Sequence, residues 1–134
     1  MATTGDTNLS ILLRTLQPTR EAGAYVFCTV GPSFAIPWPV VLGFFREAEG
    51  VTLVLRQEVA DQFGLPYDLV MAWLTLTVHS SLAAVGLTAA VAHALTAENI
   101  SCNVVAAYYH DHLFVAQADA DQALAALRQL AAQR

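Results

Sequence analysis

The most regular hydrophobic pattern of the chain lies between residues 72 and 132. Alternation over 72–78 predicts a strand with Leu74, Leu76 and Val78 on one face. The patterns that follow predict a helix over 86–97, strands over 100–109 and 113–117, and a last helix over 120–132. His110, Asp111 and His112 are expected to form the tight turn between the two strands. The order from residue 72 is therefore strand, helix, strand, strand, helix.

The first half of the chain is less regular. Asn8 is expected to cap a short leucine-rich helix, and β-branched and aromatic residues predict strands over 24–30 and 51–55. Prolines interrupt residues 31–39, helical turns are expected over 40–47, and a short helix over 56–63 ends at Gly64. This half either supplies a last strand to the other half or forms a second, degenerate copy of it.

These elements predict an α+β fold built from ferredoxin-like βαββα units. Strands that are joined by few residues pair antiparallel, and two helices with apolar stripes cover one face of the resulting sheet. The loop before residue 72 divides the 134 residues into an N-terminal half, 1–70, and a C-terminal half, 71–134.

The amino-acid composition limits the classes of partner that we expect for this protein. The chain is 56% hydrophobic and 13% charged, so some apolar surface is expected to remain for self-association. Its six arginines are scattered and lysine is absent, so no basic patch for nucleic acid is expected. There is no apolar run of ~20 residues for a membrane span and no recognisable signal peptide. Cys28 and Cys102 are expected to be buried free thiols, and the protein to be cytoplasmic.

The turn His79-Ser80-Ser81 gathers polar groups where a strand passes into a helix. Unpaired N–H groups and partial positive charge at a helix N-terminus suit a carboxylate, and Gly86 permits close approach of a ligand. The structural alternative is that Ser80 or Ser81 simply caps the helix. Asn103 is predicted to be a buried amide in mid-strand, and its side chain is expected to bind either the ligand or the neighbouring loop that contains His79. The candidate ligand-binding residues are Val78, His79, Ser80, Ser81, Val85, Gly86, Leu87, Thr88 and Asn103.

Catalytic chemistry has little support in the sequence. Without lysine no side chain forms a Schiff base, and there is no nucleophile elbow, phosphate-binding loop or activated cysteine. His110 and His112 suggest a zinc site or metal-dependent enzyme that also uses His79, but Asp111 between them is an ordinary turn former. We therefore expect no catalytic residue, metal or cofactor, and a role for His110, Asp111 and His112 in contacting a ligand or a partner subunit.

Several runs resemble small bacterial tandem ACT-domain proteins of uncharacterised function. They are AWLTLTVHSSL at 72–82, AVGLTAA at 84–90, ISCNVV at 100–105 and HDHLFV at 110–115, with YVFCT at 25–29 and FREAEGVTL at 45–53 upstream. The resemblance implies two ACT-like halves, the first degenerate. It also implies a regulatory or sensor protein that binds an amino acid or similar metabolite at the strand-to-helix loop 78–88, across a homodimer interface. The alternative is an interaction module without a small ligand, which docks through Trp73, Thr75 and Thr77.

Overall fold

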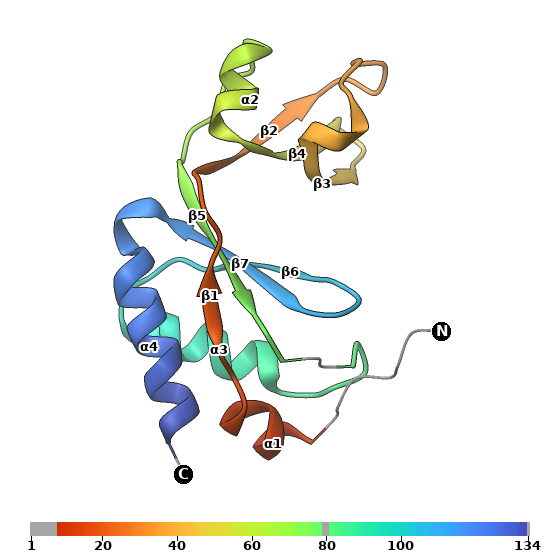
Figure 1. The fold of residues 1–134 in the computed structure, drawn as a ribbon. Coiled ribbons are helices and arrows are strands. Elements are labelled where there is room, and N and C mark those ends of the chain that lie inside the picture. Colours follow the sequence, from red (N-terminus) through yellow and green to blue (C-terminus); the bar gives the residue numbers. More distant parts are fainter. Residues whose placement is uncertain (1–7, 79–80, 134) are drawn as a thin grey trace. The chain divides into compact units, whose positions relative to one another are not determined.

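The chain folds into two compact units, and a computed structural model describes residues 8–78 and 81–133 of it (Figure 1). One unit combines Met1–Glu21 with Ala72–Arg134 and is called the split unit. The other consists of Ala22–Met71 and is called the central unit. Each unit has its own hydrophobic core.

The split unit contains a four-stranded sheet in the order β1-β5-β7-β6. Strand β1 pairs antiparallel with β5, and β6 pairs antiparallel with β7. β1 thus occupies the place of the last strand of a ferredoxin-like βαββαβ unit, although it comes from the start of the chain. Its elements are α1 (Leu9–Arg14), β1 (Pro18–Arg20), β5 (Met71–Leu76), α3 (Leu87–Ala97), β6 (Asn103–Ala106), β7 (Asp111–Ala116), the 3₁₀ turn η2 (Gln117–Asp119) and α4 (Ala120–Ala132).

Helices α3 and α4 cover one face of this sheet, as predicted (Figure 1). Leu74 and Leu76 of β5 are buried in the same core as Leu113 and Val115 of β7. The side chain of Asn8 accepts a hydrogen bond from the Ile11 N–H at 3.2 Å and caps α1. The buried leucines of the α1 segment, Leu12 and Leu16, join this core and attach the N-terminal segment to the C-terminal half.

The central unit is a smaller version of the same plan. Its elements are β2 (Tyr25–Val30), the 3₁₀ turn η1 (Trp38–Val40), β3 (Val41–Arg46), β4 (Val51–Arg56) and α2 (Gln57–Gln62), and its strands lie in the order β3-β4-β2. Met71, the first residue of β5, pairs with Tyr25 and stands in the fourth position. The proline-containing segment between β2 and β3 replaces the first helix of the unit.

Two local predictions are wrong. The segment 40–47 forms strand β3 rather than helical turns, because its pairing with β4 across a short turn outweighs local helix preference. The turn predicted at His110, Asp111 and His112 lies earlier, at Ala107–His110, where the Ala107 N–H donates to the His110 carbonyl at 3.1 Å. Asp111 and His112 belong to β7 and face Ala106 and Val105 of β6, so strand β6 is also shorter than predicted.

The predicted fold class is confirmed: both units are ferredoxin-like α+β units with antiparallel strand pairs. The N-terminal half combines both expected roles, since β1 completes the split unit and 22–71 form a degenerate copy. The boundary between residues 70 and 71 stays a prediction. Of the helices that the structure describes, none has the length and apolar character needed to cross a membrane.

Candidate functional site

The candidate ligand loop leads from the end of β5 to the start of α3. Val78 is buried, whereas His79 and Ser80 lie outside the described residues. The Ser81 hydroxyl accepts a hydrogen bond from the Ala83 N–H at 3.1 Å, and the Ser81 carbonyl accepts one from the Ala84 N–H at 2.9 Å. Ser81 therefore stabilises a turn within the loop and does not cap α3 as the structural alternative expected.

Gly86 is the N-cap of α3 and adopts a left-handed conformation, with φ of 103°. No side chain in the described part of the chain caps this helix. Leu87 is buried and Thr88 is exposed at the start of α3, while Val85 just before it is 82% exposed. The first N–H groups of an α-helix have no intrahelical acceptor and carry partial positive charge, so this end of α3 suits an anionic group.

A second loop meets the first through His110. The Nδ1 atom of His110 lies 3.1 Å from the Val78 carbonyl oxygen. A carbonyl oxygen only accepts, so Nδ1 carries the proton and donates. Tyr108 and Tyr109 in the same turn expose about half of their surface, and their ring centroids are 5.1 Å apart. His110 thus holds the β6–β7 turn against the start of the candidate loop.

His112 has different partners, on the sheet face opposite the helices. Its Nδ1 atom accepts a hydrogen bond from Trp73 Nε1 at 3.0 Å and lies 3.2 Å from Thr75 Oγ1. Thr75 Oγ1 donates to Glu21 Oε2 at 2.9 Å. Because the Trp73 indole only donates, Nδ1 of His112 is unprotonated in this arrangement. The sequence placed Trp73 and Thr75 on this face, but nothing in it linked them to Glu21.

Burial dominates the electrostatics around this histidine. Burial lowers the pKa of His112, and so does the charge of His110, whereas the carboxylates of Glu21 and Asp111 raise it. Burial raises the pKa of Asp111, and the charges of His112 and His110 oppose that rise. Within residues 8–78 and 81–133, no three His, Cys, Asp or Glu side chains gather in a way that would hold a metal ion.

Asn103 differs from its prediction. It is the first residue of β6 and is exposed, rather than a buried amide in mid-strand. Its Nδ2 atom donates to the Phe114 carbonyl at 3.2 Å, and Phe114 is its cross-strand neighbour. A side chain at the end of a short strand stays accessible to water, which the longer predicted strand did not anticipate.

Both cysteines are free, as predicted. Cys28 is buried and Cys102 is partly buried, and burial raises the pKa of both thiols. A raised pKa keeps a thiol protonated near neutral pH, which disfavours nucleophilic chemistry.

Comparison with known proteins agrees with this geometry. ACT-domain sequence models match residues 4–72 and 70–129. A protein of unknown function from Vibrio cholerae, described as a possible transport protein, is 48% identical, with a TM-score of 0.83 over 92% of this chain and 95% of that chain. A protein from Agrobacterium tumefaciens is 20% identical, with a TM-score of 0.66 over 87% of this chain and 89% of that one.

The regulatory subunit of aspartate kinase from Thermus flavus shares the fold at 9% identity, with a TM-score of 0.58 over 85% of this chain and 96% of that chain. No protein in the comparison with curated proteins matches the chain.

Proposed function

Because the chain belongs to the ACT-domain family, we propose that it is a non-catalytic regulatory or sensor protein that binds an amino acid. ACT domains are regulatory small-molecule-binding domains. The proposed site is the loop 78–88 of the split unit, and the protein acts as a cytoplasmic homodimer. The free thiols agree with a reducing compartment.

The N-terminus of α3 is the observation that carries this proposal. Gly86 brings the chain into the helix, and no side chain among the described residues caps it, so the N–H groups of Leu87 and Thr88 point out of the helix end. An α-carboxylate would accept hydrogen bonds from these groups and gain from the helix dipole. His79 and Ser80 remain part of the proposed site, as do Ser81 and Asn103.

The β6–β7 turn supports the same location. His110 fixes this turn to the Val78 carbonyl, so the exposed rings of Tyr108 and Tyr109 belong to a loop attached to the site. Aromatic rings offer apolar contact and attract cationic groups. They suit the side chain or the ammonium group of a bound amino acid.

A thermal-shift screen of the twenty amino acids, followed by calorimetric titration, tests the proposal. A ligand at a hundredfold excess over its Kd stabilises the folded state by ~2.7 kcal/mol. The amide of the active amino acid is expected to bind at least tenfold more weakly, since it lacks the carboxylate that the helix end would bind. If no amino acid shifts the transition at millimolar concentration, or if acid and amide bind equally, the proposal is wrong.

A matched pair of variants at Val85 tests whether the ligand binds at the N-terminus of α3. Val85 precedes the helix and is 82% exposed, so Val85→Asp and Val85→Asn should both fold. The aspartate places a negative charge beside the proposed carboxylate position, and we expect it to weaken binding about tenfold, while asparagine changes binding little. Equal effects of the two substitutions would place the ligand elsewhere.

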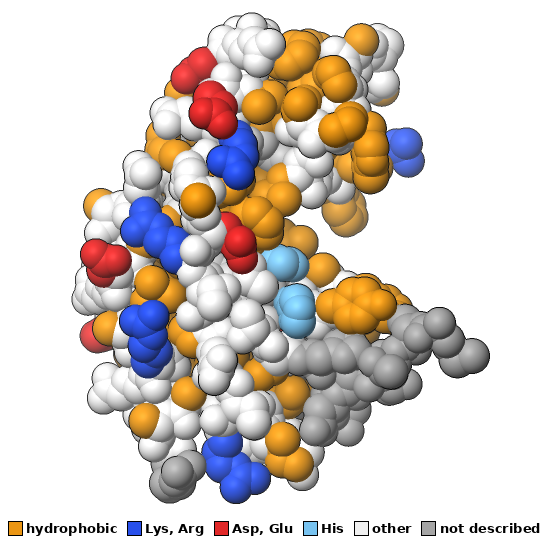
Figure 2. Space-filling view, in the orientation of Figure 1, with side chains coloured by type: hydrophobic (Ala, Val, Ile, Leu, Met, Phe, Trp, Pro, Cys, Tyr) orange, Lys and Arg blue, Asp and Glu red, His pale blue; other side chains and the backbone are white. Residues whose placement is uncertain are grey.

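A second candidate function is an interaction module without a small ligand. The central unit exposes large hydrophobic side chains along η1 and β3, and Figure 2 shows hydrophobic atoms over this region at the upper right. Trp38 is 75% exposed and Phe45 is 71% exposed. Such patches mark interaction sites in many proteins. This candidate predicts a partner in pull-down experiments that is lost with Trp38→Ser and Phe45→Ser, and it fails if wild type recovers none and is monomeric.

A further inference from the structure

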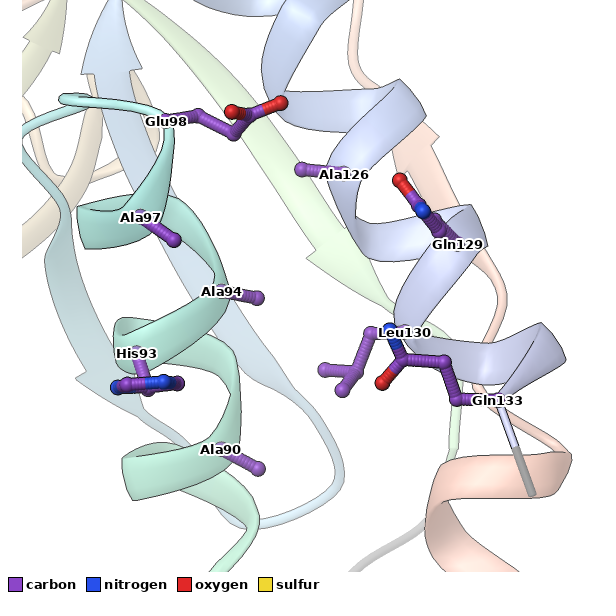
Figure 3. A pocket seen from close by; sticks show the side chains of 9 residues that line it. All are labelled: Ala90, His93, Ala94, Ala97, Glu98, Ala126, Gln129, Leu130 and Gln133. Atoms are coloured by element: carbon purple, nitrogen blue, oxygen red, sulfur yellow. The ribbon is translucent and has the colours of Figure 1, made fainter.

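Helices α3 and α4 of the split unit leave a groove between them. The groove has a volume of about 490 Å³. Figure 3 shows the alanines Ala90, Ala94 and Ala97 of α3 on one side, and Leu130 of α4 and its C-cap residue Gln133 on the other. The face of α3 buried against the sheet is a different one, formed by Leu87, Val91 and Leu95. The groove therefore adds a second apolar face to α3.

The composition of α3 indicates that this second face is covered. Its eleven residues, LTAAVAHALTA, contain no Asp, Glu, Lys or Arg. A helix on the outside of a sheet normally turns charged or polar residues to water, and a helix face made of apolar residues is normally buried. Along the groove, α3 presents only alanines and His93, and His93 and Ala97 are exposed within the chain. A partner that packs on this face of α3 would remove its apolar side chains from water.

The polar groups at the groove show which partner fits. His93 of α3 and Glu98, the C-cap residue that follows α3, both line it. When two copies of α3 pack antiparallel with His93 opposite Glu98 of the second copy, Ala94 comes to lie opposite Ala97. The imidazole then meets a carboxylate at both ends of the contact, and small residues meet in the middle, where they let the helices approach closely.

We propose that α3 packs antiparallel against α3 of a second copy of this chain, across a two-fold axis, with each α3 lying over the groove of the other copy. A two-fold contact uses the same patch twice, so one patch must carry both complementary groups, as α3 and its C-cap residue do. The inference rests on the homodimer of the proposed function, but not on amino-acid binding, which is assayed separately.

The mass in solution, measured by sedimentation over a range of concentrations, tests this contact. Wild type is expected to be a dimer. Ala94→Glu buries an uncompensated carboxylate in the contact, which should raise the dimer Kd by about a hundredfold or more. The control is Ala89→Glu, the same change at an exposed position of α3 that does not line the groove. A monomeric wild type, or equal effects of the two substitutions, overturns the proposal.

Charge exchange provides a second test at exposed positions that should not affect folding. His93→Glu would face Glu98 of the second copy and weaken the dimer, whereas combining it with Glu98→Arg should restore the wild-type Kd. If the double variant dissociates as readily as His93→Glu alone, the proposed pairing is wrong. Amino-acid titration of Ala94→Glu then shows whether ligand binding survives without the dimer, which separates failure of this contact from failure of the ligand site.

Discussion

At the scale of single residues, Gly86 combines two constraints. Its φ of 103° lies in the left-handed region that L side chains rarely adopt, and a Cβ there would come 2.9 Å from Leu9 Cδ2 of α1. Gly86→Ala is therefore expected to lower the free energy of unfolding by about 1–3 kcal/mol. Urea denaturation measures this loss.

The control for that measurement is Gly31→Ala, because a Cβ at Gly31 meets nothing within 4 Å and its φ lies outside the left-handed region. Its effect should stay within about 1 kcal/mol and can be stabilising, since alanine reduces the entropy of the unfolded chain. Equal losses at both glycines would show that the backbone at Gly86 is not constrained.

The lowered pKa of His112 gives stability a pH dependence. In the folded state burial lowers the pKa of the imidazole, whereas the unfolded chain takes up the proton near the ordinary pKa of about 6.5. The unfolded state then binds more protons, so the unfolding free energy falls as pH drops below about 6.5 and levels off below the lowered pKa.

Urea denaturation at pH 7.5 and at pH 5.5 tests this for wild type and His112→Gln, a variant that cannot titrate. The variant should be less stable at pH 7.5, because the glutamine oxygen replaces the acceptor imperfectly, but it should lose less stability than wild type on acidification. If both proteins lose the same amount, His112 does not cause the pH dependence.

At the scale of elements, the sequence predicted α1 to α4 well, but it also placed helical turns over 40–47, where β3 forms, and it predicted the strands unevenly. The leucine repeat after Asn8 and the pattern of α3 identify helices because helical periodicity is local. Strand β1, with three residues, carries no such pattern, and its pairing with β5 is settled by residues more than fifty positions away. The loop 78–88 was predictable as a strand-to-helix junction, whereas the attachment of His110 to Val78 depends on where the β6–β7 turn falls.

The link between β1 and β5 depends on a buried hydroxyl. Thr75 is 6% exposed and donates to the Glu21 carboxylate just after β1. Thr75→Val keeps the shape but leaves that carboxylate without its donor, so we expect a loss of about 1–3 kcal/mol in the unfolding free energy. Thr77→Val is the matched control: Thr77 donates to the Gln17 carbonyl at 2.7 Å but is exposed, so water can replace its hydroxyl. A loss as large at Thr77 would contradict the role of burial.

At the scale of the whole molecule, order in the sequence and order in space differ. The first ACT-domain match covers residues 4–72, yet residues 8–21 pack in the split unit with the C-terminal half. The fourth strand of the split unit, β1, comes from the N-terminal segment of the chain and not from the C-terminal half. In the central unit the fourth position is taken by its last residue, Met71, which pairs with Tyr25. A division at residue 70 and a division into the two compact units therefore make different predictions about cooperative unfolding.

Native-state hydrogen exchange distinguishes the two divisions. Leu12 is 2% exposed in the core of the split unit, and Leu55 is fully buried in the core of the central unit. Replacing either by alanine should cost about 2–5 kcal/mol. Leu12→Ala is expected to speed exchange in α3, α4 and β7, while Leu55→Ala speeds it in β2 and β4, because each substitution destabilises the unit whose core it opens. If Leu12→Ala instead weakens β2 and β4 and spares α4, residues 1–70 unfold as one domain.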